Sequence, residues 1–156
     1  MAASFSWAGL QLGALLAFAA HSGTVTSAAV LLYGSGIAWT LFYDTIYAHQ
    51  DKDDDALIGV KSTARLLGEN SRPWLRGFMV ASVLLMAAAV VMALMPGGGP
   101  LTLTLALAGV WIFGWHMAWQ LGRLNIDDPA NCLMIFRSNR DAGLLPALFL
   151  AAAALL

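Results

Sequence analysis

Charge is what this sequence has least of. Only 11% of its 156 residues are Asp, Glu, Lys or Arg, whereas soluble domains carry about 25% charged residues. Together with a hydrophobic content of 60%, this low fraction excludes an ordinary soluble domain. The formal net charge of −1 also argues against a nucleic-acid partner, because such partners are held by clustered basic residues.

Cysteine is almost absent as well. The single cysteine, Cys132, excludes an internal disulfide framework and any cysteine-rich metal site, and we expect it to fill a small apolar space. No Lys or Arg precedes Lys52, so the first apolar run lacks the basic segment that opens a secretory signal peptide. We therefore expect that run to be a membrane helix.

Five charge-free apolar runs predict an all-α, multi-pass transmembrane helical bundle that occupies residues 1–156 as one domain. Each run is close to the ~20 residues that span a bilayer as a helix, and the last is slightly short. The third and fourth runs are separated by a Pro-Gly-Gly-Gly-Pro turn that a helix would not cross. The expected spans are residues 2–20, 24–43, 77–95, 101–121 and 142–156.

The eight basic and nine acidic residues all fall in the two remaining polar segments, 44–76 and 122–141, which we expect to be loops. Five alternating spans place both segments on the same side of the membrane. The positive-inside rule assigns that side to the cytoplasm or its topological equivalent. We expect the membrane to be the bacterial inner membrane, with the mitochondrial inner membrane as the alternative.

The first polar segment carries an acidic stripe. If the second span continues as a helix, about 100° per residue places Asp44, Asp51 and Asp55 on one face, with Tyr47 beside them. Carboxylates on one stripe repel one another, and Mg²⁺ favours a few carboxylates together with waters and substrate phosphates. A solvated acidic loop is the alternative, but carboxylates at a membrane boundary usually have a function. The stripe therefore predicts a site for a magnesium-bound diphosphate.

Calcium binding is a second alternative for the acidic segment, because Asp51, Asp53 and Asp55 match the first ligands of an EF-hand loop. The sixth position of such a loop requires glycine and the twelfth requires glutamate. Here these positions hold Ala56 and Ser62. The calcium reading therefore fails.

Residues 58–68 indicate a short helix that begins near Ser62 or Thr63 and ends at Gly68. The start of a helix next to Lys61 is a plausible anion site. A surface helix that snorkels its basic side chains is the alternative, and the residues alone leave the two readings open.

The two polar segments together resemble those of a known family. The pattern Tyr43-Asp44-Thr45-x-Tyr47-Ala48-x-x-Asp51-x-Asp53-Asp54-Asp55, followed by Ile58-Gly59-Val60-Lys61-Ser62-Thr63-Ala64, resembles the second aspartate-rich motif of the UbiA superfamily of membrane prenyltransferases. Phe136-Arg137-Ser138-Asn139-Arg140-Asp141 resembles a late-loop pattern of its 4-hydroxybenzoate polyprenyltransferase branch, which acts in ubiquinone synthesis. The resemblance covers essentially the whole chain.

The resemblance implies a helical bundle with a central cavity, in which two aspartate-rich motifs help hold Mg²⁺ on a polyprenyl diphosphate. The diphosphate leaves, and the ring of 4-hydroxybenzoate attacks the allylic cation ortho to its hydroxyl. Membrane lipid surrounds the bundle. The implied roles are metal and diphosphate binding for Asp44, Asp51, Asp55 and Asp54, and substrate binding for Lys61 (diphosphate), Arg137 (acceptor carboxylate) and Tyr47. Asp53 is expected to be solvated, and anchoring at the membrane surface is the alternative for Arg137.

The family's first motif, Asn-Asp-x-x-Asp-x-x-x-Asp, has no counterpart, because the sequence contains no Asn-Asp pair. We therefore expect a missing N-terminal half as partner, and no catalysis by this chain alone. Another aromatic acceptor, such as a homogentisate or a naphthoate, is the second hypothesis. A non-enzymatic protein such as a small cation-transport subunit is the third hypothesis. Such a protein is expected to carry acidic groups deep within several spans, and the expected spans here carry none.

Overall fold

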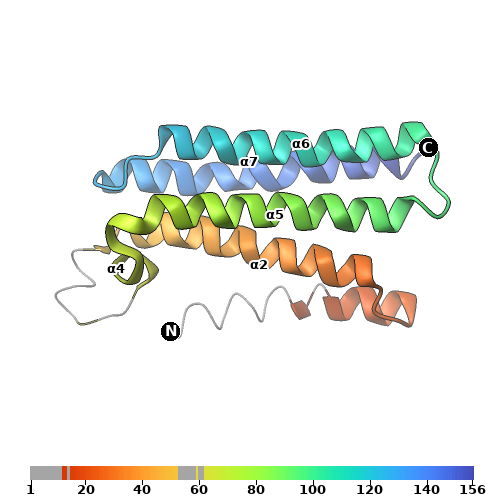
Figure 1. Ribbon diagram of the computed structural model, residues 1–156, viewed down its shortest axis with the longest axis horizontal. Coiled ribbons are helices and arrows are strands. Elements are labelled where there is room, and N and C mark those ends of the chain that lie inside the picture. Colours follow the sequence, from red (N-terminus) through yellow and green to blue (C-terminus); the bar gives the residue numbers. More distant parts are fainter. Residues whose placement is uncertain (1–11, 14, 53–58, 60–61) are drawn as a thin grey trace.

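The computed structural model describes residues 12–156 except 14, 53–58, 60 and 61 (Figure 1). Every secondary-structure element in this described part is helical, which confirms the all-α class. Residues 12–13 and 15–22 are helical at the N-terminal side. The elements that follow are α2 (Ser27–Ala48), α4 (Thr63–Leu67), the 3₁₀ helix η1 (Gly68–Asn70), α5 (Ser71–Leu94), α6 (Pro100–Arg123) and α7 (Pro129–Ala153).

The four long helices lie side by side in two layers, with α6 and α7 over α5 and α2 (Figure 1). Helix α5 packs against both α2 and α6, and α7 packs against α6 and α2, so the four close into a bundle. One core cluster lies toward the charged end, and a second packs at the opposite end. The fully buried large side chains of the first cluster are Phe42, Ile46, Leu75, Phe113, Met117 and Ile135.

Small residues let these helices approach closely. A Cβ at Gly109 of α6 would lie 2.6 Å from Cβ of Phe149 in α7. Between α2 and α5, the Ser35 hydroxyl donates to the carbonyl of Ser82 at 2.8 Å, and the Ser82 hydroxyl donates to the carbonyl of Ser35 at 2.9 Å. Close approach at small residues, with hydroxyl hydrogen bonds across the interface, is the packing typical of membrane helices.

The outer faces of the bundle are apolar, as expected for a multi-pass membrane bundle. Helices α5 and α6 are each long and apolar enough to cross a membrane, with peak mean hydropathies of 2.5 and 1.5. Large apolar side chains such as Leu84, Trp111 and Leu148 are exposed, at 63%, 68% and 66% of their surface. An exposed apolar surface of this kind is typical of a protein that contacts lipid or further helices.

The segment 122–141 is not the loop that we expected, because α7 begins at Pro129 and carries residues 129–141 as helix. Its start is fixed by Asp128, whose Oδ1 accepts from the backbone N–H groups of Ala130 at 3.0 Å and Asn131 at 3.2 Å. Pro129 occupies the first turn, where its missing N–H costs nothing. The charges of this segment led us to start the expected fifth span at residue 142, which is too late, whereas the cap at Asp128 marks the start of the helix.

Candidate active site at the charged end of the bundle

Asp44 lies near the C-terminal end of α2, just beyond the expected span. Its side chain is partly buried, and desolvation raises the pKa of its carboxyl. Within the described residues the ion pair that forms is Arg140–Asp141, so no described basic side chain neutralises Asp44. A partly desolvated carboxylate without a cation gains most from binding one. Asp44 is therefore a partly buried carboxylate that no described cation compensates, and its metal-ligand role stays a prediction.

The expected helical stripe of carboxylates is interrupted. Helix α2 ends at Ala48, and Asp51 lies in the turn that follows it, not on a continued helix. A long-range contact lies just beyond the end of α2: His49, at the C-cap and only 3% exposed, places its Nε2 3.0 Å from the Ser71 hydroxyl. Asp53, Asp54, Asp55 and Lys61 lie outside the described residues.

The His49 contact also fixes the tautomer of the ring. The Ser71 hydroxyl donates to the carbonyl of Gly68 at 2.7 Å, so it must accept from an Nε2–H of His49. Burial, with a smaller contribution from Lys52, lowers the pKa of His49, and Asp127 opposes this shift. His49 is therefore held neutral, and it joins the end of α2 to the start of α5.

Aromatic side chains join the two segments that carry the family resemblance. Tyr43 and Tyr47 of α2 both contact Phe136 of α7, with ring centroids 5.8 Å and 4.8 Å apart. One turn earlier in α2, Trp39 Nε1 donates to Asn139 Oδ1 at 3.0 Å. The structure thus brings the acidic motif's helix and the 136–141 segment together along one interface.

Arg137 and Tyr47 are the two predicted substrate-binding residues that the structure describes. Tyr47 is 38% exposed at the edge of the aromatic interface, where one face of its ring packs on Phe136. Arg137 is exposed on α7, beside that interface. The predicted residues Asp44, Tyr47 and Arg137 therefore share the same end of the bundle.

Our reading of the sequence missed the parts played by Trp39 and Asn139. The sequence contains no signal for this pair, because the need of Asn139 for a partner follows from its burial (6% exposed) in α7. Gly143, one turn further along α7, makes room for Trp39: a Cβ there would lie 2.6 Å from the indole Cη2.

In the part of the chain that the structure describes, no group of three or more His, Cys, Asp or Glu side chains is arranged to hold a metal ion. Of the four predicted metal ligands only Asp44 and Asp51 belong to that part. The structure therefore supplies one well-placed carboxylate, Asp44, and an aromatic wall formed by Tyr43, Tyr47 and Phe136.

The fold and this site define a helical membrane protein whose polar chemistry is gathered at one end of the bundle. The model of the UbiA prenyltransferase family matches residues 2–140, and the chain belongs to this family. This match confirms the resemblance drawn from the motifs.

Similar proteins include the mitochondrial 4-hydroxybenzoate polyprenyltransferases of Drosophila pseudoobscura pseudoobscura (46% identity over 144 residues), Mus musculus (47% over 143) and Homo sapiens (45% over 143). Each alignment covers 91% of this chain and 33–35% of the relative, so the chain spans about a third of the length of the curated relatives it matches. No solved structure matches the chain.

Proposed function

We propose that this chain is the part of a 4-hydroxybenzoate polyprenyltransferase that carries the second aspartate-rich motif. The enzyme would transfer a polyprenyl group from polyprenyl diphosphate to 4-hydroxybenzoate in ubiquinone biosynthesis. The observation that carries the proposal is the joint placement of the two motif segments, α2 with Asp44 and α7 with Phe136. The similarity to proteins of that name over 91% of the chain supports it.

In this proposal Asp44, Asp51, Asp54 and Asp55 hold Mg²⁺, which when bound neutralises charge that develops on the diphosphate. Lys61 contacts the diphosphate, and Arg137 pairs with the carboxylate of the aromatic acid. The allylic C–O bond breaks and its electron pair leaves with the diphosphate. The ring carbon ortho to the hydroxyl then forms the new C–C bond and loses its proton to solvent.

The aromatic wall has a separate role in the proposal. The rings of Tyr43, Tyr47 and Phe136 limit the access of water along the α2–α7 interface, and their faces attract a cation. An allylic cation that meets these rings is protected from attack by water. This protection favours prenyl transfer over hydrolysis of the diphosphate.

We further propose that catalysis requires a polypeptide carrying the first motif, because the sequence contains no Asn-Asp pair. The test is product formation by the purified chain with and without a co-expressed segment bearing that motif. We expect prenylated 4-hydroxybenzoate only from the pair, and robust turnover by the chain alone would refute the requirement. Preference for homogentisate or a naphthoate as acceptor would support the second hypothesis. If the pair forms no product with any acceptor, the result would support a non-enzymatic protein.

The decisive variant is Asp44→Asn, with the exposed Asp127→Asn as the charge-matched control. We expect Asp44→Asn to lower turnover of the assembled enzyme at least ~100-fold, the scale of losing one preorganised electrostatic group. Because burial raises the pKa of Asp44, its charged form opposes folding at neutral pH, so the same variant should unfold at a higher denaturant concentration. Lost activity with increased stability indicates a functional carboxylate, whereas loss of both would indicate a structural one.

The proposed location is an inner membrane that carries ubiquinone synthesis. The similar proteins are named mitochondrial, and those names give no support to the bacterial inner membrane that the sequence reading placed first. Fractionation of the native source, followed by alkaline carbonate extraction, tests this location. An integral membrane protein stays in the pellet.

A further inference from the structure

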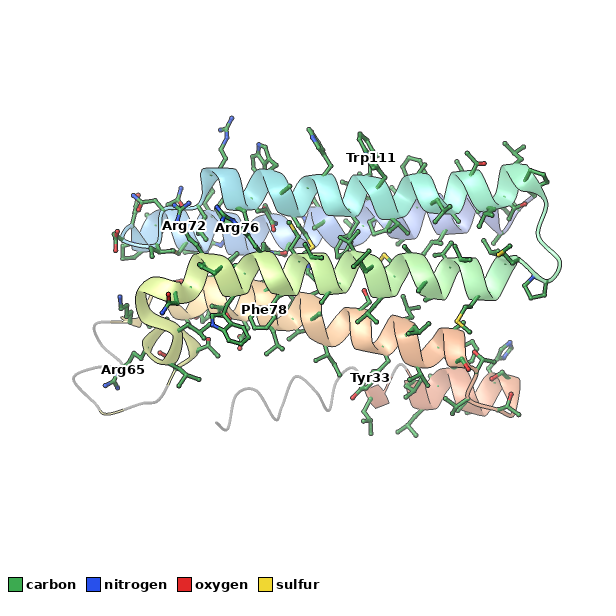
Figure 2. The ribbon with its side chains drawn as sticks, in the orientation of Figure 1. Tyr33, Arg65, Arg72, Arg76, Phe78 and Trp111 are labelled. Carbon is green, nitrogen blue, oxygen red and sulfur yellow. The ribbon has the colours of Figure 1, made fainter. Side chains whose placement is uncertain are left out.

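A groove of about 360 Å³ runs between α5 and α6 at the charged end of the bundle. Figure 2 shows Arg72 and Arg76 together at this end, on the side of α5 that faces α6. The groove is separate from the α2–α7 interface that carries the candidate active site. Its lining residues are Arg72, Arg76, Met79, Ala118, Leu121 and Gly122.

Arg72 is held in place at the polar end of this groove. Its Nη2 donates to the carbonyl of Leu124 at 2.7 Å, and Leu124 is the C-cap of α6. Carbonyls at a helix C-terminus carry partial negative charge and attract a cation. Since a guanidinium has five N–H donors, this bond positions Arg72 and leaves donors for a second ligand.

Arg76 follows one helical turn after Arg72 and is exposed. Like charges four residues apart on a helix repel each other and destabilise it. The ion pair formed among the described residues is Arg140–Asp141, so no described carboxylate neutralises Arg76. An anion bound between Arg72 and Arg76 would remove their repulsion and engage both guanidinium groups.

The rest of the groove is apolar and faces outward. Met79, Ala118 and Leu121 continue it away from the two arginines, along the two helices long enough to span a membrane. Ala118 follows Trp115 by three residues, so both lie on the same face of α6. Trp115 is 60% exposed, and Trp111, 68% exposed, points away from the bundle in Figure 2. This face of α6 is therefore an exposed apolar surface.

We propose that this groove binds an anionic phospholipid, with its phosphate between Arg72 and Arg76 and one acyl chain along Met79, Ala118 and Leu121. Guanidinium groups match phosphate oxygens in geometry through paired N–H donors, and two of them favour a headgroup with a net negative charge over a zwitterionic one. A free phosphate would bind the arginines and leave the apolar lining of Met79, Ala118 and Leu121 exposed to water. Two cations next to a continuous apolar lining therefore favour a lipid.

The test measures lipid binding to the full chain in detergent by native mass spectrometry, with dioleoyl phosphatidylglycerol and dioleoyl phosphatidylcholine as probes. We expect tighter binding of phosphatidylglycerol. Arg76→Gln should weaken it about tenfold, the scale of one charge-assisted hydrogen bond. Arg140→Gln is the charge-matched control and should leave binding unchanged, since Arg140 pairs with Asp141 and lies outside the groove.

A second variant, Ala118→Phe, fills the apolar part of the groove without changing any charge. This variant should also weaken the binding of phosphatidylglycerol. It keeps the test decisive if Arg76→Gln folds poorly. Equal binding of the two lipids, or equal losses in Arg76→Gln and Arg140→Gln, would overturn the proposal. Displacement of phosphatidylglycerol by inorganic phosphate at the same concentration would show a free-phosphate site and would overturn the lipid assignment.

Discussion

The packing of α6 against α7 predicts opposite effects for one substitution at two glycines. Alanine in place of a helical glycine stabilises a helix by about 1 kcal/mol when nothing obstructs it. At Gly77 of α5 a Cβ meets no atom within 4 Å, whereas at Gly109 of α6 it would lie 2.6 Å from Cβ of Phe149 and 3.4 Å from Cα of Pro146. The 2.6 Å approach is too close for two carbon atoms, and Cβ of Phe149 moves only with its backbone, so α6 and α7 must separate.

Overpacking of a well-packed interface costs about 1–3 kcal/mol. We therefore expect Gly77→Ala to raise the free energy of unfolding by about 1 kcal/mol. The free energy of unfolding of Gly109→Ala should be lower than that of Gly77→Ala by about 1–3 kcal/mol. Because both variants make the same chemical change in a helix, helix propensity cancels in the comparison and the contact with α7 remains.

The assay is reversible unfolding of the purified chain in mixed micelles, followed by circular dichroism as the denaturing detergent increases. A Gly109→Ala variant that is as stable as Gly77→Ala would refute the close approach of α6 to α7. A Gly77→Ala variant that loses stability would instead refute the open space at the start of α5.

Two further predictions concern the contacts around the candidate site. Asn139→Leu leaves the indole N–H of Trp39 without its acceptor. It should lower the free energy of unfolding by about 1–3 kcal/mol. In a double-mutant cycle, adding Trp39→Phe should cost less stability than Trp39→Phe does in the original chain, because the donor has already lost its acceptor. Burial lowers the pKa of His49 in the folded chain. At a pH just below the ordinary histidine pKa of 6.5, the unfolded chain therefore binds more protons than the folded chain, and stability should fall as the pH drops through 6.5. His49→Gln should reduce this dependence in unfolding curves at pH 5.5 and 7.5; an unchanged slope would show that another group causes it.

The helices could be predicted from the sequence where apolar runs end in unambiguous breakers. The Pro-Gly-Gly-Gly-Pro turn separates α5 from α6, and Gly68 closes α4 with a φ of 51°, a backbone conformation that favours glycine. Helix α7 was harder, because the charges of residues 136–141 suggested a loop. Its start depends on capping by Asp128, a local signal that the sequence contains and that the charges outweighed.

The site could be predicted only in its residue types. Spacing indicated a carboxylate stripe, but α2 ends at Ala48, before Asp51. The bond between His49 and Ser71 just after that end joins residues that are distant in the sequence. Likewise, the contact of Tyr47 with Phe136 follows from the way α7 closes the bundle onto α2. A single sequence indicates which residues can bind a metal or a substrate from their chemical groups. Which residues lie next to them depends on packing between segments that are distant in the sequence.

Unpaired polar atoms connect the packing of this chain to its proposed function. Among the described residues, six buried side-chain atoms have no hydrogen-bond partner. Four of them belong to Thr45 near the end of α2, to His49 and Gln50 just after it, and to Ser62 at the start of α4. Each such atom costs about 1–3 kcal/mol when desolvated, so a bundle selected for stability alone would not gather them beside Asp44. Their concentration at the motif-bearing end, away from the apolar cluster of Val90, Ala106 and Val110, is the pattern expected where polar groups are kept for a ligand. The apolar half of the bundle offsets that cost, which is why the helices can form while the chemistry still depends on what binds at the charged end.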